Sequence, residues 1–292
     1  MLEQRFRERG TVRLALDSVA IIGRHDGRLR SRVIAQTLAE DVAAMLARSR
    51  DLRVPRAEFV APYAAADLTP EEIGRELSVR GAAVLTVEAE APRVNVGVEL
   101  IDVHREELVA QEQFLVSSHE LIALERRILR MLTARHARHP ITEDEGEYAS
   151  LIEARFARAA EAWNEALAIL DTILTPAAAL EFAAVVVEGD VEERIDEARV
   201  RLSEARSAPA LVWDAKLRIR FDGDWNGAEE ALRGAIAIDA VSAEAHAILG
   251  DLLLANGKNE EGAMHRRLVA ELMPLGSPDN FSARFTSNLL RA

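Results

Sequence analysis

The segment that decides the fold is residues 243–274, with the sequence AEAHAILGDLLLANGKNEEGAMHRRLVAELMP. Two stretches of it carry apolar residues at helical spacing, and a turn around Gly257 separates them. Gly223 and Gly189 also follow apolar helical stretches, so the turn signal recurs every 34 residues. Glycine suits such a turn because it tolerates the positive φ that ends a helix. The sequence therefore predicts a series of helix-turn-helix units.

A period of 34 residues is that of the tetratricopeptide repeat. If Gly257 is position 15 of a unit that starts at Ala243, the small residue expected at position 8 is Gly250. The proline expected at position 32 is Pro274. One period earlier, the positions that pack the second helix on the first are small, large and small: Ala228, Leu232 and Ala235.

Two full repeats are predicted, at residues 209–242 and 243–276. A diverged repeat is predicted at about 175–208, where Arg194 takes the small position 20. Repeats of this kind stack into a solenoid that presents a surface to another polypeptide.

Length and composition limit the number of domains and the functions that are possible. The 292 residues allow two domains, and the absence of cysteine excludes disulfides and cysteine-based chemistry. The net charge of −13 argues against direct nucleic-acid binding by the whole chain, because a phosphate backbone attracts basic surface. Residues 1–13 are locally basic, which fits a solvated arm or a nucleic-acid contact. With no signal peptide and no apolar stretch of about 20 residues, we expect a cytoplasmic protein without a membrane span.

The N-terminal half has a different pattern of apolar residues. A short apolar run at residues 18–23 predicts a buried strand, a helix is predicted over 29–50, and a second strand at 52–54. Thr69 opens another helix with a capping box. From Gly81 the apolar period becomes two, which predicts a meander of three strands.

A closing helix is predicted from a Ser117-x-x-Glu120 cap to about Arg138, which makes the half an α/β domain with helices packed on a mixed sheet. A single helix is expected over residues 148–174. The predicted organisation is a basic arm at 1–17, the α/β domain at 18–138, an acidic linker at 139–147, tetratricopeptide-like helical repeats at 148–276 and a C-terminal capping segment at 277–292.

Four segments together resemble a known bacterial family. They are SVAIIG at 18–23, LAEDVAAMLAR at 38–48, IGRELSVRGAAVLTV at 73–87 and RVNVGVELIDV at 93–103. These segments are similar to the TolB amino-terminal-like, or FlgO-like, domain, which commonly continues into tetratricopeptide repeats. The resemblance implies an α/β domain in the regulatory part of a signalling protein, as in class III adenylate cyclases and CadC-like transcription regulators.

In those relatives an output domain precedes the module, whereas about 17 residues precede the first predicted strand here. We therefore expect the output, such as a cyclase or a DNA-binding regulator, to be supplied in trans.

Motifs for chemistry are absent from the sequence. Neither GxGxxG nor GxxxxGK[ST] occurs, and no Ser-His-Asp arrangement stands out, so we expect no enzyme activity and no cofactor. The loop at residues 23–27 and the pair His136 and His139 are weak candidates for a ligand pocket and a metal site. His246 is predicted to be a half-buried packing residue.

The repeats are the better place for a site. The positions expected to face the groove of the repeats include Trp213, Leu217, Arg220, Phe221, Asp251 and Leu254. They predict partner binding, with the alternative that Trp213 and Phe221 pack on the preceding repeat. Two functions remain: a non-enzymatic adaptor that binds a protein through its repeats, or a small-molecule sensor with its ligand in the α/β domain. Homo-oligomer formation is left open.

Overall fold

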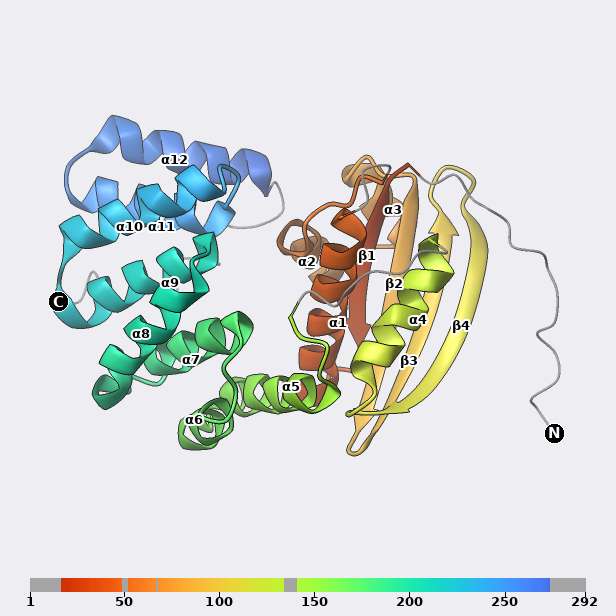
Figure 1. Cartoon of the computed structure of the whole chain (residues 1–292). Coiled ribbons are helices and arrows are strands. Elements are labelled where there is room, and N and C mark those ends of the chain that lie inside the picture. Colours follow the sequence, from red (N-terminus) through yellow and green to blue (C-terminus); the bar gives the residue numbers. More distant parts are fainter. Residues whose placement is uncertain (1–16, 49–51, 67, 134–140, 274–292) are drawn as a thin grey trace. The chain divides into compact units, whose positions relative to one another are not determined.

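The computed structural model describes residues 17–48, 52–66, 68–133 and 141–273 (Figure 1). The chain divides into two compact units, Met1–Ser117 with Ala123–Arg138, and Ser118–Ile122 with His139–Ala292. The first, the α/β unit, holds a four-stranded sheet, and the second, the helical unit, is built from helices. A mixed sheet followed by a helical region confirms the predicted order of fold classes. Most of the basic arm, Pro274 and the capping segment lie outside the described residues.

The elements of the α/β unit are β1 (Val19–His25), α1 (Leu29–Ala47), α2 (Ala57–Ala65), α3 (Pro70–Glu76), β2 (Gly81–Glu90), β3 (Arg93–Asp102), β4 (Glu107–Ser117) and α4 (Leu121–Thr133). The sheet has the order β1-β2-β3-β4. β1 pairs with β2 in parallel, and the pairs β2–β3 and β3–β4 are antiparallel. The meander predicted from Gly81 is confirmed.

Helices cover both faces of the sheet at β1. Ala20 and Ile22 pack in one cluster with Tyr63 of α2 and Ile73 of α3. α1 contacts β1 and β2. Because successive strand residues point to opposite faces, α1 covers the side of Ile21. β1 is therefore buried on both faces, which explains its continuous apolar run.

The predicted second strand at residues 52–54 is wrong. Arg53 makes one isolated parallel bridge with Ser18, in which the Val19 N–H donates to the Arg53 carbonyl at 3.0 Å. Pro55 has no N–H for the next rung of the ladder. The chain instead forms α2, a helix that the sequence pattern missed because Pro62 lies inside it.

The two predicted helix caps have different outcomes. Thr69 caps α3 as predicted, because its hydroxyl accepts from the Glu72 N–H at 3.2 Å and the Glu72 carboxylate accepts from the Thr69 N–H at 2.8 Å. The Ser117 cap is wrong, since Ser117 is the last residue of β4 and α4 begins at Leu121. Pairing of Ser117 with Arg93 keeps it in the sheet.

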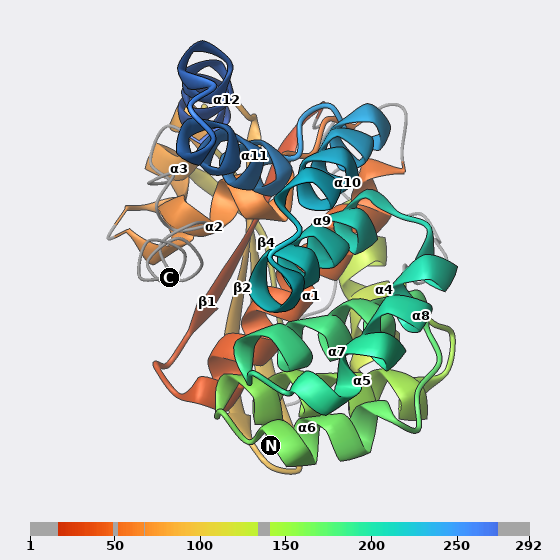
Figure 2. The same ribbon diagram turned by 90° about the vertical axis from the view of Figure 1, so that its left-hand side faces the viewer.

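The elements of the helical unit are α5 (Glu145–Ala159), α6 (Trp163–Leu170), α7 (Pro176–Glu188), η1 (Glu192–Arg194), α8 (Ile195–Ala205), α9 (Ala208–Leu217), the π-helical turn η2 (Arg218–Asp222), α10 (Trp225–Ile238), α11 (Ala243–Ala255) and α12 (Asn259–Leu272). They pack as the pairs α5–α6, α7–α8, α9–α10 and α11–α12. The pairs follow one another in chain order (Figures 1 and 2). The second helix of each pair contacts the first helix of the next, as in α6–α7, α8–α9 and α10–α11.

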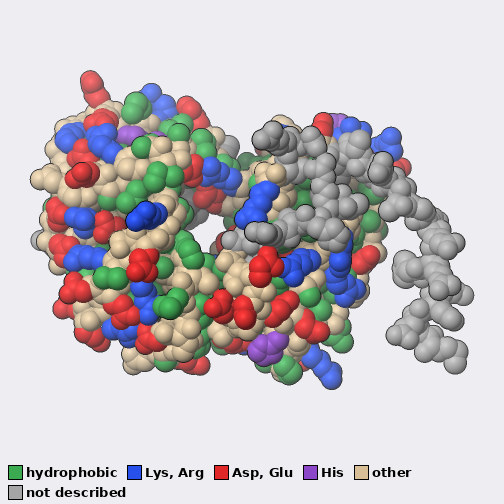
Figure 3. Space-filling model, in the orientation of Figure 1, with side chains coloured by type: hydrophobic (Ala, Val, Ile, Leu, Met, Phe, Trp, Pro, Cys, Tyr) green, Lys and Arg blue, Asp and Glu red, His purple; other side chains and the backbone are tan. Residues whose placement is uncertain are grey.

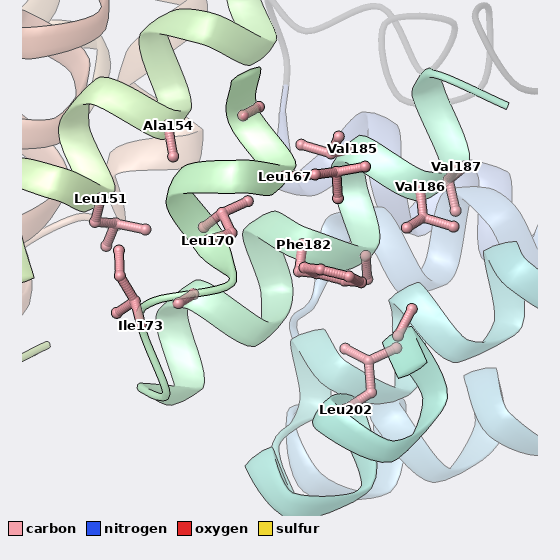
Figure 4. Close-up of a cluster of buried hydrophobic side chains, with 14 of the residues drawn as sticks. Leu151, Ala154, Leu167, Leu170, Ile173, Phe182, Val185, Val186, Val187 and Leu202 are labelled. Atoms are coloured by element: carbon pink, nitrogen blue, oxygen red, sulfur yellow. The ribbon is translucent and has the colours of Figure 1, made fainter. Parts of the chain in front are cut away.

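The single helix predicted over residues 148–174 is wrong, because the chain turns back between α5 and α6. Glu161 takes a left-handed conformation with φ 59°, and the Ala162 N–H donates to the Ala157 carbonyl at 2.9 Å. The turn lets Leu170 of α6 join Leu151 of α5 in one buried cluster (Figure 4). α5 also begins at Glu145, so the last three residues of the predicted linker are helical.

The three periodic glycines divide into two kinds. Gly223 and Gly257 have φ of 63° and 76°, as a helix-ending turn requires. Gly189 keeps a helical φ of −86°, and the next residue, Asp190, takes the positive φ of 56°. A Cβ at Gly189 would lie 2.8 Å from the Trp163 ring, so close packing explains this glycine.

Gly250 has the packing role that its position predicts. A Cβ on Gly250 would lie 3.2 Å from the Gly262 carbonyl oxygen, and a Cβ on Gly262 would lie 2.8 Å from the Gly250 carbonyl oxygen. Two glycines facing each other thus allow α11 and α12 to cross at close range.

Candidate partner-binding surface

The residues predicted to bind a partner come from two helix pairs. Trp213 and Leu217 lie on α9, Arg220 and Phe221 on η2, and Asp251 and Leu254 on α11. η2 continues α9 and ends at Gly223, whose N–H donates to the Arg218 carbonyl.

Trp213 and Phe221 are both half-buried. Both pack against the hydrophobic cluster that contains Phe182 of α7 and Leu202 of α8 (Figure 4). On the side of α11, Lys216 Nζ lies 3.6 Å from the centroid of the Trp213 ring. The packing alternative therefore accounts for the buried part of each aromatic ring, and the rest of each ring stays accessible.

Leu217 is fully buried, so its predicted contact with a partner is wrong. It belongs to the same cluster as Ala210, seven residues earlier on α9, and residues at this spacing share one face of a helix. The preceding helix pair covers that face, which the repeat register had placed toward the groove.

Asp251 and Leu254 are directed toward α12. Asp251 Oδ1 lies 3.1 Å from Arg266 Nη1. Leu254 is 38% exposed, and its Cγ would lie 2.8 Å from a Cβ on Gly262. The six residues therefore do not form one continuous surface.

Arg220 borders a hollow that the sequence did not indicate. The hollow has a volume of about 550 Å³ and is lined by the α5–α6 and α7–η1 turns, including Glu161, Trp163, Glu165, Asp190 and Glu193. We call it the acidic hollow. Arg220 Nη2 lies 3.0 Å from Asp190 Oδ1, so this ion pair joins η2 to the rim of the acidic hollow. Elsewhere on the visible face of the helical unit, acidic and basic side chains are interspersed (Figure 3).

A buried histidine pair joins α11 to α12. His246 is a packing residue as predicted, but it is buried rather than half-buried, and the sequence did not indicate its partner. His246 and His265 are 4% and 7% exposed, and their Nδ1 atoms are 2.7 Å apart. His246 Nε2 lies 3.1 Å from the Ala240 carbonyl, which only accepts, so this nitrogen carries a proton. One proton between the two Nδ1 atoms makes the bond, and a second would disrupt it.

The pKa of His265 reflects this site. Burial lowers it first, the neighbouring His246 lowers it further, Glu261 opposes the shift and Arg233 adds to it. The neutral form of His265 is therefore favoured. Nothing in the spacing of two histidines 19 residues apart indicates the contact, which depends on how the helices cross.

The two weaker candidates for a ligand or metal site gain no support from the structure. In the loop at residues 23–27, the Gly27 N–H donates to His25 Nδ1 and the Arg28 N–H donates to Asp26 Oδ1, both at 3.0 Å, so local hydrogen bonds hold it as a turn. His136 and His139 lie outside the described residues. Across the described ranges, no three His, Asp or Glu side chains are grouped closely enough to hold a metal ion.

Comparison with solved structures gives weak similarity. No family model and no curated protein matches the sequence. The crystal structure of TolB from Acinetobacter baumannii matches with a TM-score of 0.28 and 13% identity, over 42% of this chain and 29% of that chain. This match is too weak to establish the expected likeness to TolB, and it spans less than a third of that chain. None of the described helices has the length and apolar character needed to cross a bilayer.

Proposed function

We propose that this protein is a non-enzymatic regulatory or adaptor protein that binds a protein partner through its helical unit. The observation that carries the proposal is the ordered series of helix pairs, in which each second helix contacts the first helix of the next pair. The glycine recurrence of 34 residues matches the tetratricopeptide repeat. Solenoids of such repeats present extended surfaces to other polypeptides.

The proposed contact surface combines the acidic hollow with Arg220 and the accessible parts of Trp213 and Phe221. Partly exposed aromatic rings are the side chains that most often dominate a protein interface. Four carboxylates surround Trp163 in the hollow. They favour a partner segment with basic side chains, because complementary charge gives specificity and speeds association.

The resemblance to regulatory parts of bacterial proteins suggests what the partner is. In this proposal the partner is an output protein, such as a cyclase or a DNA-binding regulator, supplied in trans in the cytoplasm. The protein would then act in bacterial signalling or transcription control.

The experiment is a pull-down with the intact chain, followed by titration of the purified partner against variants. Trp213→Ala combined with Phe221→Ala is expected to weaken binding by at least ~2 kcal/mol. Since both rings also pack on the core, circular dichroism and a melt are run first. Arg220→Glu provides a second variant, because Arg220 is exposed and its substitution leaves the aromatic packing in place.

Ile238→Ala is the matched control, since Ile238 is 62% exposed on α10 and does not belong to the proposed surface. Full-strength binding by the folded double variant and by Arg220→Glu would contradict the proposal.

The alternative function, a small-molecule sensor, is favoured by one specific observation. The α/β unit contains a second hollow, of about 570 Å³, lined by polar and charged residues only. A ligand retained through purification and seen by native mass spectrometry would support this alternative.

A further inference from the structure

The second hollow lies at one end of the sheet in the α/β unit. Its charged lining consists of Arg53, Arg80, Arg105, His104, Asp17 and Asp102, and we call it the basic hollow. The residues come from the chain before β1, the segment before α2, the α3–β2 connection and the β3–β4 turn. Its volume of about 570 Å³ falls within the range of about 300–1,000 Å³ typical of small-molecule sites.

The backbone around the basic hollow is held in place. The Arg80 N–H donates to Ser18 Oγ at 3.0 Å, and the Arg80 carbonyl accepts from the Val103 N–H at 2.9 Å. The Arg53 N–H donates to the Asp17 carbonyl at 2.8 Å, and the Arg53 guanidinium donates to the Ser78 carbonyl. Hydrogen bonds therefore hold the backbone of Arg53 and Arg80 in place before a ligand binds, which reduces the conformational entropy lost on binding.

The carboxylates of the basic hollow are engaged locally. Asp102 is 2% exposed, and its Oδ1 accepts from the backbone N–H groups of His104 and Arg105 at 3.0 and 3.2 Å. Asp17 Oδ1 accepts from the Ser18 hydroxyl at 2.9 Å. Asp102 thus shapes the β3–β4 turn.

None of the three guanidinium groups has an acidic partner among the residues that the structure describes. In the part of the chain that the structure describes, none of Arg53, Arg80 and Arg105 forms an ion pair with a carboxylate. The protein as a whole carries a net charge of −13, so carboxylates are not scarce. Three guanidinium groups against two carboxylates leave an excess of positive charge in the lining, which a bound anion would offset.

We propose that the basic hollow binds a small anion that carries phosphate or carboxylate groups. The planar guanidinium fork matches the oxygens of both groups with two parallel hydrogen bonds. The charged groups of the lining favour a charged ligand over a mainly apolar one. This inference deepens the sensor alternative and is independent of partner binding by the helical unit, because the ligand is measured on the protein alone.

The test is titration calorimetry of the intact chain with inorganic phosphate, pyrophosphate and citrate at constant ionic strength. One of these probes is expected to bind saturably at one site. Arg80→Gln and Arg105→Gln are each expected to weaken that binding at least tenfold. Arg105 stands in an exposed turn held by backbone hydrogen bonds to Asp102, so its substitution leaves the turn intact.

Arg93→Gln is the matched control. Arg93 is an exposed arginine at the opposite end of β3, and its substitution changes the net charge by the same amount. Binding by Arg93→Gln within twofold of the parent protein supports the site. The absence of saturable binding by all three probes, or an equal loss in all three variants, would overturn it. Tighter binding of pyrophosphate or of citrate tells whether the ligand is a phosphate or a carboxylate.

Discussion

Two sets of arginines, one in each unit of this protein, have different surroundings. In the helical unit they bridge helices, as when Arg158 of α5 pairs with Glu181 of α7. In the α/β unit, Arg53, Arg80 and Arg105 surround a hollow and form no carboxylate pair among the described residues. A paired charge between helices is part of the fold, whereas a guanidinium without a carboxylate partner beside a hollow can bind an anionic ligand. The contrast can be tested by removing charges from each unit.

The largest effect is expected from Glu181→Ala. Glu181 is 6% exposed, and both Arg155 and Arg158 pair with it. Burial opposes the charge of Arg158, but Glu181 and Glu188 outweigh it and raise the pKa of the guanidinium. Removing Glu181 leaves a partly buried cation short of its main partner, so we expect a loss of about 3 kcal/mol in urea unfolding. Glu230→Ala, at an exposed position of α10, is the control. Equal losses of stability in the two variants would show that the ion pairs of Glu181 do not stabilise the helical unit, and the contrast between the units would fail.

A smaller effect is expected where packing, rather than charge, joins two helices. Gly250→Leu forces α11 and α12 apart at the crossing with Gly262, at about 2 kcal/mol. The melting temperature is the measurement, with Ala263→Leu on the exposed face of α12 as the control. An unchanged melting temperature for Gly250→Leu would show that the close crossing is wrong.

The histidine pair predicts a pH dependence of the helical unit. Because the pKa of His265 is lowered in the folded protein, the unfolded chain takes up the proton first as the pH falls. The stability is therefore fully present above the unfolded pKa of about 6.5 and declines below it. Melts at pH 7.5 and 5.5 are expected to differ less for His265→Leu than for the parent protein. An equal difference in both proteins would assign the pH dependence to other groups.

The smallest effect is expected from the arginines of the basic hollow. Without ligand, Arg80→Gln and Arg105→Gln are each expected to change the free energy of unfolding by no more than about 0.5 kcal/mol, because no acidic partner is lost. Urea unfolding provides the measurement. A loss as large as that of Glu181→Ala would mean that these arginines support the fold after all.

Local signals in the sequence predicted much of the fold. The apolar period of two from Gly81 indicated β2, β3 and β4, and the capping box at Thr69 indicated α3. The turns at Gly223 and Gly257 followed from the 34-residue recurrence. The strand periodicity and the capping box act between residues close in sequence, and the recurrence is a pattern of the sequence itself, so all three are visible without the fold.

The misplaced elements depended on neighbours far along the chain. Residues 52–54 have the composition of a strand, but only one bridge to Ser18 forms before Pro55. The break between α5 and α6 is set by burial of Leu170 against Leu151, for which the left-handed turn at Glu161 is needed. Apolar periodicity alone predicted one continuous helix through this break.

The sequence by itself therefore determined the two kinds of architecture, the turns at Gly223 and Gly257 and the packing role of Gly250. The tertiary structure decided which side chains are available for function. It buried Leu217, joined His246 to His265 and gathered three arginines around one hollow. Periodicity records which face of an element is apolar, but only the packing of distant segments decides what covers that face and which charges meet.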